Sequence, residues 1–260
     1  MKMRIVTYNF RTWGGSYGDG INNFLHRCGV IFETIHREMP DVIGFQEIMP
    51  RPYEYLVRML PEYTFVGQFR DADFLGEGTY IAVRKDRFQI LGYNTFWLSP
   101  TPYVPGSRFA EQSDCPRICN VARVRHIETN FVFRVFNTHL DHVGEGARVL
   151  GMKCILDEMV RLNDVARFPS ILMGDMNARP SDEAIRMCNE FEPYPLTDVT
   201  KEIPCTFHHF GRLTDCKIDY IFVTDEFKDK VTGVGIWEDQ INGSYLSDHY
   251  PVWMDVEIEA

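Results

Sequence analysis

Ser247-Asp248-His249-Tyr250-Pro251-Val252 is the segment that decides the fold, because it places an Asp-His pair directly before a predicted final strand. Five earlier segments share this design, with polar groups at the end of an apolar, strand-like run. These segments are Thr7-Tyr8-Asn9, Phe45-Gln46-Glu47, Asn137-Thr138-His139-Leu140, Gly174-Asp175-Met176-Asn177 and Lys217-Ile218-Asp219-Tyr220. Six strand ends that deliver carboxylates, amides and imidazoles are hard to explain by folding alone, so we interpret them as parts of one functional site.

The order of these six segments resembles that of the endonuclease/exonuclease/phosphatase superfamily. Its members are metal-dependent phosphoesterases such as deoxyribonuclease I, the abasic-site nucleases and the inositol 5-phosphatases. The resemblance extends from Thr7 to Val252, and the segment Phe96-Trp97-Leu98-Ser99-Pro100 is similar to a bacterial subgroup of the family. It implies a four-layer α/β sandwich of the deoxyribonuclease I type. In this fold two mixed β-sheets pack face to face, helices flank them, and the site lies where the strand ends of the two sheets meet.

The periodicity of apolar residues predicts an α/β protein whose two halves share the layout β-α-β-α-β-β-β, in a single domain over residues 1–260. Strands are expected over residues 4–8, 42–45, 80–84, 89–98, 120–127, 131–138, 170–173, 218–223, 231–237 and 251–258. Helices are expected over residues 21–39, 53–60 and 147–162, and a further helix after Ser181 as its N-cap. Nothing between the halves has the composition of a linker.

The overall charge restricts the partners of the protein. The chain has 260 residues and a net charge of −10, and 45% of its residues are hydrophobic. This charge argues against long, nonspecific contact with a polyanion, because each phosphate contact needs a cation. A local basic rim and a bound metal ion can nevertheless override the average charge. No apolar run reaches the ~18 residues of a membrane span.

Seven cysteines with irregular spacing are typical of reduced thiols in a cytoplasm rather than of a disulfide framework. The usual zinc spacings are missing, so the cysteines do not predict a metal site. The N-terminus enters a strand without a signal-peptide core. We therefore expect a cytoplasmic monomer, and a leader peptide removed earlier would leave the same sequence.

The family resemblance implies a metal site at Glu47, where relatives have a Glu that binds Mg²⁺, with Mn²⁺ as an alternative. Mg²⁺ prefers a few oxygen ligands and keeps several waters, so one or two carboxylates are enough. The resemblance implies that Asp248 and Asn9 complete the ligand set. Some relatives have an Asp two positions after the first Asn, where this chain has Arg11. This difference removes one ligand and favours a one-metal site at Glu47 and Asp248.

The same resemblance assigns the catalytic side chains. Phosphoester hydrolysis needs an oriented water and donors for the charge that develops on the phosphate oxygens. The resemblance implies that Asp175 activates the attacking water and that Asn177 helps to hold the phosphate. His139 and His249 would lie on either side of the phosphate, with Asp219 as the hydrogen-bond acceptor that sets the tautomer and charge of His249.

Three further residues are expected at the site. Glu77, in Gly76-Glu77-Gly78, would orient His139 as in deoxyribonuclease-like members. Arg117 has a planar fork that suits phosphate, and His208 belongs to a Thr-Phe-His segment similar to one in close bacterial relatives, so we expect both to contact the substrate phosphate. The irregular segments 69–78 and 99–116 are expected to form the substrate rim.

Two other interpretations come from different classes of protein. Residues 138–144 partly resemble the His-x-His-x-Asp-His zinc motif of metallo-β-lactamase-like hydrolases, but the first His of that motif falls at Asn137. A non-catalytic module that binds a phosphate ligand would require missing catalytic groups, and none is missing. We therefore predict a Mg²⁺-dependent hydrolase of phosphoester bonds, with in-line attack by a water that Asp175 activates.

The substrate stays open between a nucleic acid and a smaller phosphoester, such as a sugar or inositol phosphate. The chain lacks an obvious run of basic and aromatic residues that would follow a nucleic acid strand. After Gly-Asp-x-Asn it continues Ala178-Arg179-Pro180, which differs from the Asn-Leu-Arg-Asp of tyrosyl-DNA phosphodiesterases.

Overall fold

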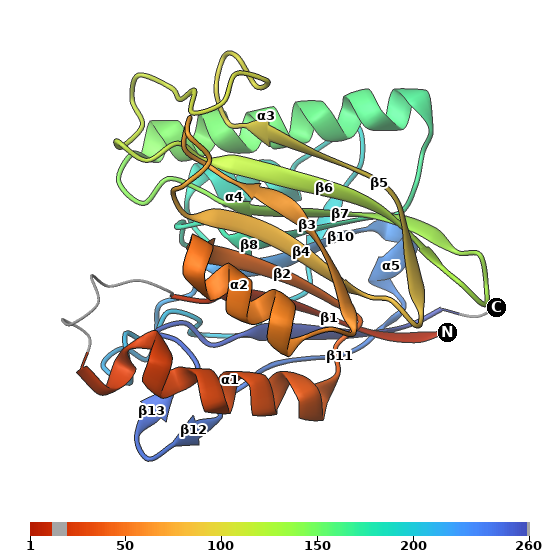
Figure 1. The fold of residues 1–260 in the computed structure, drawn as a ribbon. Coiled ribbons are helices and arrows are strands. Elements are labelled where there is room, and N and C mark those ends of the chain that lie inside the picture. Colours follow the sequence, from red (N-terminus) through yellow and green to blue (C-terminus); the bar gives the residue numbers. More distant parts are fainter. Residues whose placement is uncertain (12–19, 259–260) are drawn as a thin grey trace.

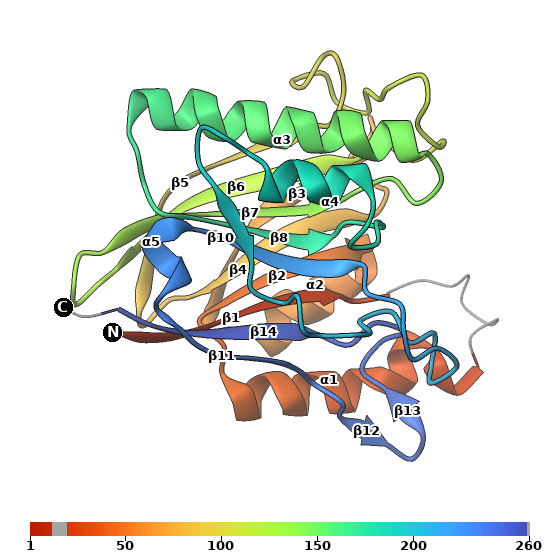
Figure 2. The same ribbon diagram turned by 180° about the vertical axis from the view of Figure 1, so that it is seen from behind.

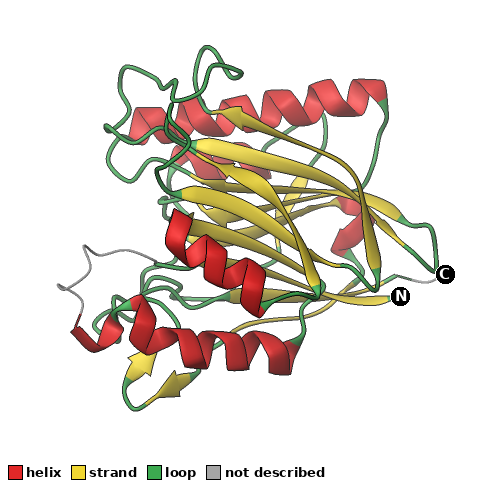
Figure 3. Ribbon diagram, viewed as in Figure 1, coloured by secondary structure: helices red, strands yellow, loops and turns green. Residues whose placement is uncertain are grey.

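Two six-stranded sheets form the centre of the computed structural model, which describes residues 1–11 and 20–258. The sheets pack face to face and helices cover their outer faces, as Figure 1 shows from one side and Figure 2 from the other. Figure 3 separates the helical outer layers from the strands between them. The arrangement is the four-layer α/β sandwich that the sequence predicts.

The first sheet has the strand order β11-β14-β1-β2-β4-β3, and the second has the order β5-β6-β7-β8-β10-β9. The strands of the first sheet are β1 (Lys2–Asn9), β2 (Val42–Ile48), β3 (Tyr63–Phe69), β4 (Gly78–Arg84), β11 (Val231–Ile236) and β14 (Val252–Glu257). Those of the second are β5 (Phe88–Trp97), β6 (Ile118–His126), β7 (Val132–His139), β8 (Ser170–Asp175), β9 (Leu196–Asp198) and β10 (Asp219–Thr224). A separate hairpin joins β12 (Gln240–Ile241) to β13 (Ser244–Tyr245).

Helices cover the outer face of each sheet. Helices α1 (Phe24–Glu38) and α2 (Pro50–Met59) pack on the first sheet, and α3 (Glu145–Val165) and α4 (Glu183–Asn189) pack on the second. The short helices η1 (Gly20–Asn22) and α5 (Asp225–Lys228) precede α1 and follow β10. Apolar cores of the described residues lie under α1 and α2, under α3 and α4, and between the two sheets.

The alternation of side chains along a strand directs the polar strand ends into the space between the sheets. In β8, Ile171 and Met173 belong to the core between the sheets, whereas Leu172 lies under α3 and α4. Asp175 is two residues after Met173, so its side chain lies on the same face of the sheet. Its carboxylate therefore points into the space between the sheets, at the point where the apolar core ends. The neighbouring strand ends follow the same rule with Asn9, His139 and Asp219.

Polar side chains of the two sheets contact each other between the apolar core and the strand ends. Gln46 Nε2 donates to Asn137 Oδ1 at 2.7 Å and to Thr7 Oγ1 at 3.1 Å. A Cβ atom on Gly44 would lie 2.5 Å from Met173 Cε and 2.7 Å from Asn137 Oδ1. The two sheets therefore approach each other closely here, and only glycine fits at position 44 without displacing a neighbour.

The apolar pattern does not predict β3, β9 or the hairpin of β12 and β13. β9 has three residues, which is too short for an alternating pattern to be recognised, and β3 is an edge strand with mostly half-buried residues. The predicted N-cap Ser181 is wrong by one position. Asp182 precedes the first helical residue, and its Oδ2 accepts a hydrogen bond from the backbone NH of Arg179 at 2.8 Å.

Two general features also follow from the described part of the chain. None of its helices has both the length and the apolar character needed to cross a membrane. All seven cysteines lie within it and none of them forms a disulfide, which agrees with the reduced thiols expected from their spacing.

Candidate active site

A cleft of about 470 Å³ opens where the inner rows of the sheets end. Its walls combine residues from the first and the last strands with residues from the loops between them. The lining residues are Arg11, Glu47, Arg70, Glu77, Cys115, Arg117, His139, His142, Asp175, Asn177, Phe207, His209, Ile218, Asp248 and His249. They include every site residue predicted from the sequence except Asn9, Asp219 and His208.

Asp175 lies at the centre of this cleft, beside His139 at the paired ends of β8 and β7. Its Oδ2 accepts a hydrogen bond from Asn9 Nδ2 at 2.9 Å, and lies 3.5 Å from His139 Nε2 and 3.9 Å from His249 Nε2. Its Oδ1 accepts a hydrogen bond from the backbone NH of Asn177 at 2.9 Å in an Asx turn. One carboxylate therefore contacts the amide and both of the imidazoles that the sequence places at the site.

His249 and Asp219 form a buried ion pair next to Asp175, with 2.8 Å between His249 Nδ1 and Asp219 Oδ2. Burial alone lowers the pKa of His249, but the carboxylates of Asp219, Asp175 and Asp248 outweigh burial and raise this pKa well above 6.5. Burial and the charge of Asp219 raise the pKa of Asp175 to about 6. At neutral pH the site therefore holds an imidazolium beside a carboxylate that can accept a proton.

Glu47, at the end of β2, has an unusual backbone and an unusual charge environment. Its φ is 58°, in the left-handed region that few residues other than glycine adopt. Asn9 Nδ2 donates to Glu47 Oε1 at 3.0 Å. Burial, followed by the charges of Glu77 and Asp248, raises the pKa of Glu47 to about 7. Such backbone strain and unfavourable clustering of acids are typical of functional sites.

Two overlapping groups of described residues could hold a metal ion: Glu47, His139 and Asp175, and Asp175, Asp219 and His249. The second group is already joined by the hydrogen bond of the His249–Asp219 pair, and a protonated imidazole offers no lone pair to a metal. In the first group the carboxylates of Glu47 and Asp175 both have raised pKa values, so a cation would relieve the burial of negative charge. The carboxylate oxygens of this group fit a hard divalent cation.

The predicted ligand Asp248 lies outside these two groups, and the predicted ligand Asn9 contacts both carboxylates of the first. Asn9 turns its amide nitrogen toward Glu47 and Asp175, and its Oδ1 accepts a hydrogen bond from the backbone NH of Arg11 at 3.1 Å. Asp248 Oδ2 lies 3.6 Å from Arg11 Nη1. Arg11 therefore supplies a positive charge of the protein itself next to Asp248.

Arg27 of α1 joins the chain segments that carry Arg11 and Asp248. It is buried, and its guanidinium donates to the backbone carbonyls of Phe10 at 3.1 Å, of Leu246 at 2.6 Å and of Arg11. A guanidinium has five N–H donors, so one side chain can link the segment after β1 to the segment before β14. These contacts fix the two segments relative to each other at the edge of the cleft.

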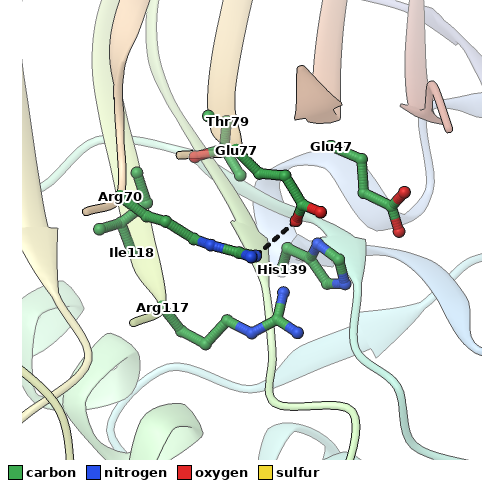
Figure 4. A pocket seen from close by; sticks show the side chains of 8 residues that line it. Glu47, Arg70, Glu77, Thr79, Arg117, Ile118 and His139 are labelled. Atoms are coloured by element: carbon green, nitrogen blue, oxygen red, sulfur yellow. Dashed lines mark hydrogen bonds and ion pairs between the residues drawn. The ribbon is translucent and has the colours of Figure 1, made fainter. Parts of the chain in front are cut away.

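Another wall of the cleft carries Arg70 and Arg117, whose side chains lie side by side in Figure 4. Arg117 is 4% exposed, its Nη2 lies 3.0 Å from His142 Nδ1, and its Nε and Nη1 have no hydrogen-bond partner among the described residues. Arg70 hydrogen-bonds to Glu77, and its Nε has no hydrogen-bond partner in that part of the chain either. Trp97 Nε1 donates to Arg70 O at 2.6 Å and fixes the backbone there. Buried donors without partners are a common sign of a binding site.

Glu77 pairs with Arg70 and not with His139, contrary to the prediction from the sequence. The nearest acidic group to His139 is Asp175, 3.5 Å from its Nε2. Burial, followed by the charges of Arg117 and Arg70, lowers the pKa of His139 well below 6.5, so this imidazole is neutral at pH 7. A full guanidinium charge binds a carboxylate more strongly than a neutral imidazole does, which explains the choice of Glu77.

His208 faces away from the cleft, so its prediction as a phosphate contact is wrong. It is 1% exposed, its ring stacks on Tyr250 with centroids 3.9 Å apart, and its Nδ1 accepts a backbone hydrogen bond at 3.0 Å. The neighbouring side chains Phe207 and His209 line the cleft instead. Phe207 forms a β-bridge with His249, and in extended chain consecutive side chains point in opposite directions, so Phe207 and His208 face opposite ways.

Sequence reasoning missed Arg70, His142, Phe207 and His209 as cleft residues. Arg70 belongs to the irregular segment 69–78, so its loop gave a signal although its own position did not. His142 belongs to the segment that partly resembles a zinc motif. In that segment Asp141 caps a turn, because its Oδ1 accepts hydrogen bonds from two backbone NH groups at 2.9 and 2.7 Å.

The fold and the cleft define a class of proteins. Two mixed sheets that face each other, with flanking helices and a polar site at the strand ends, are the architecture of deoxyribonuclease I-like phosphoesterases. The chain belongs to the Endonuclease/Exonuclease/phosphatase family, whose family model matches residues 22–249. Members of this family are phosphoesterase hydrolases that generally use a divalent metal ion. The metallo-β-lactamase interpretation of residues 138–144 is therefore wrong.

Solved structures of bacterial proteins are similar to the whole chain. A family member from Bacteroides vulgatus is 30% identical with a TM-score of 0.90, and the alignment covers 100% of both chains. The mannosyl-6-phosphatase of Bacteroides thetaiotaomicron is 28% identical with a TM-score of 0.87, over 98% of this chain and 100% of that one. TDP2 of D. rerio, complexed with a single strand DNA product, shares the fold at 19% identity, with a TM-score of 0.75 over 99% of each chain. No curated protein sequence is significantly similar.

Proposed function

We propose that this protein hydrolyses phosphoester bonds with the help of one divalent cation, Mg²⁺ or Mn²⁺, and that Asp175 activates the attacking water. The observation that carries this proposal is the position of Asp175 Oδ2, which lies within 4 Å of Asn9 Nδ2, His139 Nε2 and His249 Nε2. Asn9 therefore holds the carboxylate of Asp175 between the neutral ring of His139 and the charged ring of His249. A carboxylate in this position is suited to proton transfer next to a phosphate.

Glu47 is the proposed principal ligand of the cation, with Asp175 and Asp248 nearby. When bound, the cation would neutralise charge on the phosphate oxygens and polarise the phosphorus centre. Asn9 donates to both Glu47 and Asp175, so it sets the distance between these carboxylates. Arg11 balances the charge of Asp248, and this supports one cation rather than two.

The protein side chains handle the proton and the charge. Asp175, whose pKa is about 6, is mainly a carboxylate at pH 7 and accepts the proton of the attacking water. His249, kept as an imidazolium by Asp219, donates a hydrogen bond to a phosphate oxygen as negative charge develops on it. His139 donates another from its neutral ring. Asn177 Nδ2 donates to the backbone of residue 140 at 3.0 Å and has a second amide hydrogen for the phosphate.

The proposed substrate is a small phosphoester rather than a nucleic acid. One of the similar proteins is a mannosyl-6-phosphatase, and a net charge of −10 leaves few cations for a long polyanion. The likeness to TDP2, at 19% identity, concerns the fold. The seven free cysteines support a cytoplasmic location for this activity.

The test is a hydrolysis assay on protein stripped with a chelator. Sugar phosphates, inositol phosphates, nucleotides and single- and double-stranded DNA are offered with Mg²⁺, Mn²⁺, Ca²⁺ or Zn²⁺ in turn. We expect phosphate release from at least one small phosphoester with Mg²⁺ or Mn²⁺, and loss of that release in Asp175→Asn. Asp157→Asn is the matched control, because Asp157 is an exposed carboxylate on α3 that pairs with Lys153. No cation-dependent release from any substrate would contradict the proposal and favour a binding module.

A further inference from the structure

We propose that Arg70 and Arg117 form a niche for one unesterified phosphate oxygen, and that this niche restricts the enzyme to phosphomonoesters. The inference rests on the proposed function, since it concerns the substrate of the same site. It follows from the size of the niche, from its buried donors without a hydrogen-bond partner among the described residues, and from its place beside Glu47 and His139.

The niche is large enough for a single oxygen atom. It is a side pocket of about 10 Å³, which is close to the space that one water molecule needs. Its lining residues are Glu47, Arg70, Glu77, Gly78, Thr79, Arg117, Ile118 and His139. Figure 4 shows both guanidinium groups turned toward the side of the niche where His139 lies, with Glu47 beyond it. An ester-linked carbon chain does not fit in this space.

The niche also has donors that the described protein does not satisfy. Nε and Nη1 of Arg117 and Nε of Arg70 are buried without a hydrogen-bond partner among the described residues. Arg117 is 4% exposed and its hydrogen-bonding neighbour is the imidazole of His142, not a carboxylate. Arg70 hydrogen-bonds to the carboxylate of Glu77, and its Nε lies 3.9 Å from Oδ1 of Asp71, beyond hydrogen-bond distance. The pair therefore holds one guanidinium charge without a hydrogen-bonded acid, and planar guanidinium donors suit a phosphate oxygen.

The surroundings of the phosphate distinguish a monoester from a diester. A monoester presents three unesterified oxygens, whereas a diester presents two and carries a second organic chain. In the proposed site the three oxygens would face Glu47, which would hold the cation, the ring of His249 and the arginine niche. A diester would have to place its second chain against one of these groups, and the niche is too small to accept it. The small size of the niche therefore selects a terminal phosphate.

The experiment compares two substrates with one leaving group: p-nitrophenyl phosphate and its methyl ester, which is a diester. The variants are Arg117→Met and Arg70→Met, and the control is Arg125→Met. Arg125 lies at the far end of β6 from Arg117, hydrogen-bonds to Gln89, and also has an Nε without a partner among the described residues. Circular dichroism and thermal melts show whether each variant folds, and Arg117→Lys is the conservative replacement if Arg117→Met does not.

We expect the wild-type protein to prefer the monoester strongly. Arg117→Met should lower kcat/KM for the monoester about 10- to 100-fold, as the loss of a charged hydrogen bond predicts, and change the diester rate less than about threefold. Arg125→Met should resemble the wild type. Equal or faster hydrolysis of the diester by the wild type, or equal losses on both substrates, would overturn the inference.

A binding measurement separates this inference from the proposed function. If neither substrate is hydrolysed with Mg²⁺ or Mn²⁺, the proposed function fails, and titration calorimetry with inorganic phosphate and dimethyl phosphate still decides about the niche. Phosphate should bind more tightly than dimethyl phosphate, and the difference should vanish in Arg117→Met and persist in Arg125→Met. Equal binding of the two anions, or an unchanged preference in Arg117→Met, would show that the niche does not select terminal phosphate.

Discussion

On one side of the cleft His249 lies among carboxylates, and on another side His139 lies beside two arginines. Both imidazoles are buried and both contact Asp175, at 3.9 and 3.5 Å. The carboxylates nevertheless raise the pKa of His249 well above 6.5, while burial and the arginines lower that of His139 well below it. Similar burial thus goes with opposite pKa shifts, so that His249 is charged and His139 neutral, because the neighbouring charges decide which form is stable.

The comparison separates two functions within one cleft. The acidic side, with Asp219 and His249 next to Asp175, can move a proton near neutral pH. The arginine side, with Arg70 and Arg117, carries positive charge on planar guanidinium groups that suit a phosphate. Asp175 lies between the two sides, so its replacement is the strongest test of the comparison.

Asp175→Asn should have the largest effect. It removes the proton acceptor and keeps the size of the side chain, so kcat should fall about 10³-fold, within the range of general base catalysis, while KM changes little. Steady-state kinetics on the best small phosphoester measure both constants. An unchanged kcat would show that Asp175 only forms the turn with Asn177. In the wild type, activity should rise with pH through about 6, as Asp175 loses its proton.

Glu47→Gln should lower activity about 10²-fold through weaker cation binding, with partial recovery at high Mg²⁺ or Mn²⁺. It should also stabilise the cation-free protein. The folded-state pKa of Glu47 is about 7 and the ordinary value is 4.5. At pH 8 burial of its charge therefore destabilises the fold, and a neutral Gln should raise the free energy of unfolding by about 1–3 kcal/mol.

Urea unfolding and Mn²⁺ titration calorimetry measure these two effects separately for Glu47→Gln. Unchanged cation affinity together with unchanged stability would remove Glu47 from the site.

His249→Ala and Asp219→Ala should each lower kcat about 10²-fold, and the double variant should be no worse than His249→Ala, because Asp219 acts through the imidazole. A double-mutant cycle measures the coupling. Asp219→Asn sharpens the test, since it removes the largest charge that keeps His249 protonated. The loss of activity at high pH should then begin at a lower pH than in the wild type. Additive losses and an unshifted pH profile would show that the two residues do not act as a pair.

His208→Gln should have the smallest effect, and on stability rather than on catalysis. Burial lowers the pKa of His208 to about 4, whereas the unfolded imidazole binds its proton below about pH 6.5. Between these values the unfolded state holds a proton that the folded state lacks, so the free energy of unfolding falls as the pH falls. Between pH 7 and 4 the wild type should lose about 1–3 kcal/mol more than His208→Gln does.

Urea unfolding of both proteins at the two pH values measures this difference, and kcat at pH 7 should be similar for both. Parallel stability curves would show that His208 does not titrate in this way.

The sequence predicts most of the acidic side of the cleft. Glu47, Asp175, Asp219 and His249 each stand at the end of an apolar run, and strand ends on the same edge of packed sheets are close in space. The family resemblance of these segments implies the four-layer fold, and the apolar and helical periodicities predict most of its strands and helices. The apolar runs do not predict which side chains of an irregular segment face the cleft. For this reason the sequence prediction placed His208 in the cleft, whereas Phe207 and His209 line it.

The arginine side is less predictable because long side chains from loops form it. Arg117 was expected from its position before a strand. Arg70 directly follows β3, a strand that the apolar pattern does not indicate. Arg70 pairs with Glu77 across segment 69–78, and no rule of residue spacing predicts this pair. Whether Glu77 pairs with Arg70 or with His139 depends on the folded positions of all three side chains, which the sequence does not give.

The pairing of β1 with β14 has a consequence for the kinetics of folding. β1 pairs along its length with a strand about 250 residues later, from Lys2↔Glu257 to Thr7↔Val252. Such distant pairing slows folding, because a long loop must close before its contacts form. Until β14 docks, β1 presents an open hydrogen-bonding edge, and such an edge can recruit other chains. During refolding, hydrolysis should therefore appear only in the last phase, and dilution should favour its recovery over aggregation.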